Sequence, residues 1–141
     1  MVKKSTFATS TIALSTAQGA IDAGIEAAKA LGIPMSIVIV DPAGLPKAVA
    51  RMDGASILTY EVAYKKAWTA AVTGAPTAGV HQFVASDAGS LLSMPHVDNF
   101  SVVAGGLPIR ADESCVGAVG VSGATAELDL KVAEAVVAAL G

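Results

Sequence analysis

Residues 102–124, VVAGGLPIRADESCVGAVGVSGA, contain the glycine pair and the apolar runs that decide the fold class. Leu107–Ala111 and Val116–Gly123 are short apolar segments joined by a polar turn, which predicts two paired strands. Phe100–Ala104, FSVVA, precedes them and is expected to form a further strand. Consecutive strands joined by short turns pair antiparallel, because a parallel crossover needs a dozen or more residues. This part of the chain therefore predicts an antiparallel sheet.

Helices and one hairpin are expected around this stretch. Apolar residues recur every three or four positions from Leu14 to Ala28, which predicts an amphipathic helix that Gly32 and Pro34 end. The other expected elements are a hairpin of Ser36–Asp41 and Pro46–Met52, a helix from Ser56 or Thr59 to about Val72, short helices over Thr77–Ser86 and Asp87–Ser93, and a last helix over Thr125–Leu140. The order predicts one α+β domain over residues 1–141, with helices packed against a five-stranded, largely antiparallel sheet.

The composition narrows the classes of function. The chain is 53% hydrophobic but only 4% aromatic, so alanine, valine and glycine must fill the interior, and such small residues also favour oligomers. The net charge is −3 and lysine and arginine do not cluster, which makes nucleic acid an unexpected partner. No apolar run is long enough to predict a transmembrane helix, and a cytoplasmic location is expected. Cys115 is the only cysteine, which excludes an internal disulfide and a cysteine-clustered metal site.

The glycine pair Gly105–Gly106 has two interpretations. In the first, the glycines supply the positive φ angles of a tight turn and Pro108 fixes the entry of the next strand. In the second, the missing side chains expose backbone N–H groups to an anionic ligand, and Arg110 adds a forked guanidinium donor. Both can hold together.

Three further glycines, Gly117, Gly120 and Gly123, are spaced G-x-x-G-x-x-G. This spacing does not match the G-x-G-x-x-G fingerprint of dinucleotide-binding folds. Glycine in a strand lets another backbone approach closely. The spacing therefore predicts that the last helix packs tightly over this strand.

Several motifs together resemble the GlcG/HbpS-like family, also called the haem-degrading domain. They are the Asp41-Pro-x-Gly44 turn, ARMDGA at 50–55, YKKAWTA at 64–70, AGGLPI at 104–109, VGAVGVSGA at 116–124, and Asp129. The resemblance implies a profilin-like three-layer α/β/α sandwich around a five-stranded antiparallel sheet, and it implies oligomers. For function it implies haem binding, redox sensing outside the cell, a role in cofactor or catabolic operons, or enzymatic action on small organic acids.

The chain has only two histidines to serve as iron ligands or proton carriers. His96 follows Pro95 in a polar loop and could ligate haem iron or transfer a proton near neutral pH. His81 lies on an expected helix and is a second candidate ligand. The alternative for both is an ordinary solvated or core histidine.

Three basic residues within the family motifs, Arg51, Lys66 and Arg110, could gather around a ligand carboxylate or a haem propionate. The alternative is that they form ion pairs with Asp53, Glu61 or Asp112. One helix face carries three aromatic residues spaced by four, Tyr60, Tyr64 and Trp68. They are expected to pack in the core or at a subunit interface. The alternative is that they line a pocket for an aromatic ligand.

Three functional hypotheses follow. The first is a homo-oligomeric protein that binds haem, with His96 or His81 on the iron. The binding would be noncovalent, because no C-x-x-C-H attachment site is present. The second is a cofactor-free or metal-assisted lyase or isomerase for a small aromatic or hydroxy carboxylic acid. There His96 and Arg110 are catalytic, and the ligand-binding residues are Arg51, Lys66, Gly105, Gly106, Pro108 and Tyr64. The third is a structural subunit that only assembles with partners.

Overall fold

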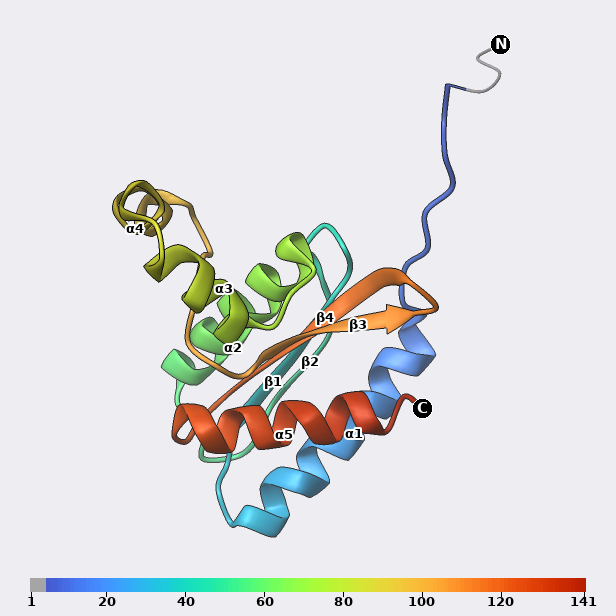
Figure 1. The fold of residues 1–141 in the computed structure, drawn as a ribbon. Helices are drawn as coiled ribbons and strands as arrows, with labels where there is room; N and C mark the ends of the chain where they lie inside the picture. The colour runs from blue at the N-terminus through green and yellow to red at the C-terminus, as the bar shows by residue number, and fades with distance from the viewer. Residues whose placement is uncertain (1–4) are drawn as a thin grey trace.

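The computed structural model describes residues 5–141, and Figure 1 shows their arrangement. The first half contains α1 (Leu14–Leu31), the hairpin of β1 (Ser36–Val40) and β2 (Pro46–Arg51), and α2 (Ile57–Thr73). Two short helices, α3 (Thr77–Ala85) and α4 (Ala88–Ser93), and a 3-10 turn, η1 (Met94–His96), follow. A second hairpin of β3 (Gly106–Ala111) and β4 (Ser114–Ser122) leads into α5 (Ala126–Ala138). The predicted helices and both hairpins are confirmed.

The sheet has four strands in the order β2-β1-β4-β3, and every neighbouring pair is antiparallel. The antiparallel prediction is confirmed, but the prediction of five strands is wrong. β1 and β4 are the central strands and are almost wholly buried, as their β-branched and small residues indicate. β2 and β3 form the two edges, so residues on β2 and residues on β3 lie at opposite edges of the sheet.

The missing strand is Phe100–Ala104, and side chains explain why it does not pair. The hydroxyl of Thr69, on α2, accepts a hydrogen bond from the Ser101 N–H at 2.9 Å. The hydroxyl of Thr77, on α3, donates to the Val103 carbonyl at 2.7 Å. Backbone groups that a neighbouring strand would satisfy are thus bonded to two threonines. The segment is held as a loop although its composition suits a strand.

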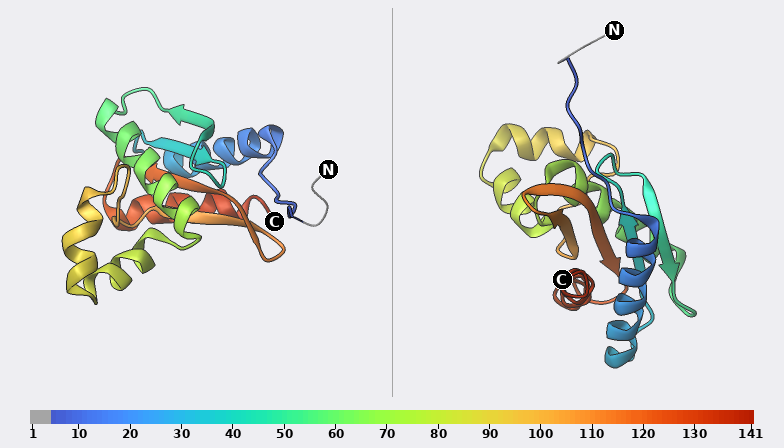
Figure 2. Two further views of the ribbon diagram at one scale, coloured as in Figure 1. Left: turned by 90° about the horizontal axis from the view of Figure 1, so that it is seen from above. Right: turned by 90° about the vertical axis from the view of Figure 1, so that its right-hand side faces the viewer.

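Helices cover both faces of the sheet. α1 and α5 pack on one face, over a core that includes Ile37, Val119 and Val136, and α2 packs on the other over Val38 and Val40. The two further views in Figure 2 show the sheet between these layers. None of the helices in residues 5–141 combines the length and apolar content needed to cross a membrane.

Of the three spaced glycines, Gly120 on β4 allows α2, rather than the last helix, to approach. A Cβ atom on Gly120 would overlap the carbonyl of Ala63 and lie 2.5 Å from the Ala67 nitrogen, both on α2. A Cβ on Gly117 would overlap the Val40 carbonyl of β1, and one on Gly123 would lie 2.9 Å from the Met35 Cα. The expectation that α5 causes this glycine spacing is therefore wrong, because the close contacts are with α2, with β1 and with the residue that precedes β1.

Candidate functional site

The glycine pair lies inside the fold, where α2, α3 and β4 meet. Gly105 has φ of 122° and its carbonyl accepts the Val121 N–H at 2.9 Å. A Cβ on Gly106 would lie 2.5 Å from the Lys66 carbonyl oxygen, and the Gly106 N–H donates to the Thr77 hydroxyl at 3.1 Å. Both glycines are buried. The geometry supports the interpretation as a tightly packed turn, since the Gly106 amide is already bonded within the protein.

Lys66 forms a buried ion pair beside this turn. Its ammonium lies 2.7 Å from Oδ2 of Asp129, and the two side chains are only 1% and 4% exposed. The same ammonium donates to the Val121 carbonyl at 3.0 Å, while Oδ1 of Asp129 accepts the Ala124 N–H at 2.9 Å. The pair therefore joins α2, β4 and α5 immediately behind Gly105.

The ion pair between Lys66 and Asp129 was not predicted, because the acidic partners considered for the basic residues were Asp53, Glu61 and Asp112. Lys66 was expected at a ligand, but its ammonium is occupied by internal partners. One signal could have shown its burial: Lys66 shares the buried face of α2 with Ala63, Ala67 and Ala70. A lysine on that face needs an acidic partner, because a buried charge is costly unless it is paired.

The two arginines lie at opposite edges of the sheet. Arg51, on β2, donates to the Ala55 carbonyl at 2.7 Å, and Arg110, on β3, donates to the Gly74 carbonyl at 2.6 Å. Because β1 and β4 lie between them, the two edge strands are about 14 Å apart at the usual strand spacing. The strand registers also place Arg51 level with Ser122 and Arg110 level with Cys115 on β4, so the two positions are farther apart still. They do not converge on one small carboxylate. Within residues 5–141, neither arginine forms an ion pair, so the alternative pairs with Asp53, Glu61 or Asp112 are also not made.

Both histidines are exposed and lie on the same protruding unit, which consists of α3, α4 and η1 (Figures 1 and 2). His81 is on α3 and His96 is on η1. Large apolar side chains are exposed on this unit as well: Phe83 at 73%, Leu91 at 56% and Leu92 at 75%. The unit thus combines imidazole groups with apolar surface, and Thr77 at the start of α3 joins it to the buried glycine pair.

Local hydrogen bonds hold the protruding unit together. Asp87 precedes α4, and its Oδ2 accepts the Ser90 N–H at 2.8 Å. This hydrogen bond with the Ser90 backbone, helped by the Ser90 side chain, holds the pKa of Asp87 below its usual value. None of the six residues of α4 is buried, so this bond to Asp87 fixes the start of a helix that has no buried side chain.

Tyr60, Tyr64 and Trp68 serve mainly in packing. Tyr60 and Tyr64 are half-buried and pack against the apolar cluster between α2 and the sheet. Trp68 packs against the turn at Gly44, where an added Cβ would overlap the indole ring. The contacts support the interpretation that these three aromatic residues pack in the core. Tyr64 was also predicted to contact a ligand, and that role stays a prediction.

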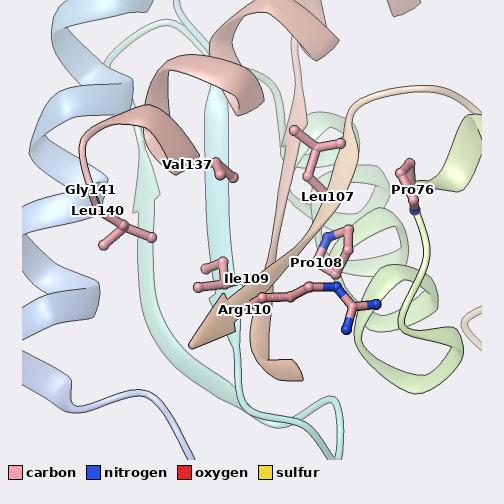
Figure 3. A pocket seen from close by; sticks show the side chains of 8 residues that line it. All are labelled: Pro76, Leu107, Pro108, Ile109, Arg110, Val137, Leu140 and Gly141. Atoms are coloured by element: carbon pink, nitrogen blue, oxygen red, sulfur yellow. The ribbon is translucent and has the colours of Figure 1, made fainter. Parts of the chain in front are cut away.

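A groove between β3 and α5 contains two of the predicted ligand residues, Pro108 and Arg110 (Figure 3). Its volume is about 360 Å³. Arg51 lines a different depression, beside Met52 and Asp53 on the other edge of the sheet. Residues 5–141 contain no group of three or more His, Cys, Asp or Glu side chains that could share a metal ion. Haem iron needs fewer protein ligands, since a single axial histidine can hold it.

Comparison with known proteins agrees with the motifs. The chain is 31% identical over 119 residues to the corrinoid adenosyltransferase PduO of Salmonella typhimurium; the match covers 84% of this chain but only 35% of PduO. The chain therefore spans about a third of the length of that relative.

Two solved structures share the fold along nearly the whole chain. A double mutant of HbpS from Streptomyces reticuli is 30% identical, with a TM-score of 0.90 and coverage of 100% of this chain and 94% of that one. The structure described as the PduOC:heme complex is 28% identical, with a TM-score of 0.84 and coverage of 92% and 94%.

The family whose sequence model is described as "Haem degrading protein HbpS-like" matches residues 12–138, which include every strand and helix of the fold. With this match and the agreement of the two solved structures, the chain belongs to the HbpS-like family.

Proposed function

We propose that this protein binds haem noncovalently. The observation that carries the proposal is the likeness to the PduOC:heme complex, which has the same fold at 28% identity. One cysteine cannot make the two thioether bonds of a C-x-x-C-H site, so the haem would be held by packing and by an iron ligand.

The protruding unit offers the chemistry that a haem needs. His96 is exposed on η1, and its neighbours Leu92 and Val97 are 75% and 40% exposed. A neutral imidazole is a common axial ligand of haem iron, and the macrocycle requires apolar contacts. Met94, in the same turn, adds a thioether, and His81 on α3 is the alternative imidazole. We place the iron ligand at His96.

Spectroscopy of the apo-protein tests this assignment. We expect His96→Ala to lose the Soret shift that hemin produces in the unaltered protein, while His81→Ala, its matched control on the same unit, retains it. Loss in His81→Ala alone would move the ligand to α3. If both variants and the double variant keep the full shift, the histidine assignment is wrong, and a shift that never saturates would contradict specific haem binding altogether.

The hypothesis of a lyase or isomerase assembled from the predicted residues receives less support from the geometry. Lys66 is buried in its ion pair, and the Gly106 amide is bonded to Thr77. Arg51 and Arg110 occupy opposite sheet edges, and His96 is on the protruding unit. Arg110 and Pro108 line the groove between β3 and α5, whereas Arg51 lines a separate depression.

A further inference from the structure

The groove between β3 and α5 has an apolar wall and one cationic end (Figure 3). The wall is formed by side chains of Pro76, Leu107, Pro108, Val137 and Leu140. Small-molecule sites are concave, mostly apolar, and use a few polar groups to fix orientation, with volumes from about 300 Å³ upward. The groove, at about 360 Å³, has the size and composition of a site for a small ligand.

Arg110 supplies the only charged side chain among the groove-lining residues. Its guanidinium donates to two backbone carbonyls, those of Gly74 at 2.6 Å and Glu113 at 3.5 Å. A guanidinium has five N–H donors, so most of those on Arg110 have no acceptor among residues 5–141. No carboxylate of residues 5–141 forms an ion pair with it. The charge is thus positioned by the Gly74 bond but is not neutralised.

The position of this charge gives the groove a direction. In Figure 3 the Arg110 side chain extends past Pro108 toward Pro76, away from Leu140 and Gly141. A carboxylate at the Pro76 end could accept two parallel N–H bonds from the guanidinium. The rest of such a ligand would then lie along the apolar wall toward α5. Asp112 and Glu113 follow Arg110 in the β3–β4 turn, so a single negative charge fits better than a dianion.

We propose that this groove binds a small monocarboxylic acid with an apolar body, and that Arg110 holds the carboxylate. The site differs from the histidine-bearing unit, and the proposal does not depend on haem binding there. A haem propionate offers the same carboxylate chemistry, so the experiment must distinguish the two sources.

Titration of the protein with hexanoate, followed by amide chemical shifts in NMR, tests the proposal. We expect saturable shifts centred on Leu107, Ile109, Val137 and Leu140. The matched neutral probe, hexanamide, should bind at least tenfold more weakly, because it cannot form the charge-assisted pair. Arg110→Gln should weaken hexanoate at least tenfold. Arg51→Gln, the matched change at the opposite sheet edge, should bind hexanoate as the unaltered protein does.

The proposal is overturned by equal binding of hexanamide and hexanoate, by a hexanoate affinity that is unchanged in Arg110→Gln, or by an equal loss of affinity in Arg51→Gln. If Arg110→Gln does not fold, Arg110→Lys replaces it, and full hexanoate affinity in Arg110→Lys would contradict the forked pairing.

A competition experiment with hemin distinguishes a small acid from a haem propionate. If hexanoate competes with hemin and Arg110→Gln loses both ligands, the groove holds a propionate and the small-acid proposal fails. Hemin binding that is unchanged in Arg110→Gln supports it.

Discussion

The buried pair of Lys66 and Asp129 allows a quantitative prediction of stability. Lys66→Met keeps the aliphatic stem but leaves the Asp129 carboxylate buried, where the Ala124 N–H is its one remaining donor within residues 5–141. Removing one partner of a buried pair costs about 3–5 kcal/mol. With a urea dependence of about 2 kcal/mol per M, the unfolding midpoint should fall by about 2 M.

The double variant Lys66→Met with Asp129→Leu separates the charge effect from the loss of hydrogen bonds. It removes both charges and leaves the Val121 carbonyl and the Ala124 N–H without these side-chain partners, at about 1 kcal/mol each. The double variant should therefore be more stable than Lys66→Met alone. Lys65→Met is the matched control, because Lys65 pairs with Glu61 at 3.2 Å on the surface and such pairs contribute at most about 1 kcal/mol.

Urea unfolding of all variants at one protein concentration measures these differences. Asp129→Leu is measured as well. A coupled buried pair is contradicted if Lys66→Met costs no more than Lys65→Met, or if the double variant loses the sum of the losses in Lys66→Met and Asp129→Leu. Either result would mean that the pair does not act as a coupled buried unit.

Two further predictions concern packing and assembly. Gly106→Ala should be strongly destabilising, because the added methyl group would meet the Lys66 carbonyl at 2.5 Å and the Thr77 methyl at 2.6 Å. Thermal unfolding measures this effect against the control Gly19→Ala, where the space around the added methyl group is open. Equal unfolding midpoints in the two variants would contradict the prediction. The chain should also form homo-oligomers, because Ile57, Phe83 and Leu92 are each at least 73% exposed. Light scattering should then give a multiple of 13.9 kDa, whereas a mass of 13.9 kDa would contradict assembly.

Local sequence patterns predicted those elements whose signals are local. α1 begins at Leu14 and ends before Gly32, as predicted, because its apolar period is regular and Gly32 adopts φ of 70°. The hairpin of β1 and β2 also agrees with its pattern. Phe100–Ala104 was predicted wrongly because its hydrogen-bond partners, Thr69 and Thr77, lie about 30 residues away on other elements. Composition alone cannot show that such side chains replace a neighbouring strand.

The candidate site was predicted less completely, because it depends on contacts between distant residues. Lys66 and Asp129 are 63 positions apart, so no local spacing joins them. Arg51 and Arg110 belong to family motifs, but motifs do not reveal that two central strands lie between them. Pro108 and Arg110 are two positions apart on one strand and line one groove; that they share a ligand site stays a prediction.

The titration of apo-protein with hemin, followed through its Soret band, tests haem binding most directly. We expect a saturable shift that reaches its end point near one haem per chain and that His96→Ala loses. A shift that rises without saturation in the unaltered protein would contradict it.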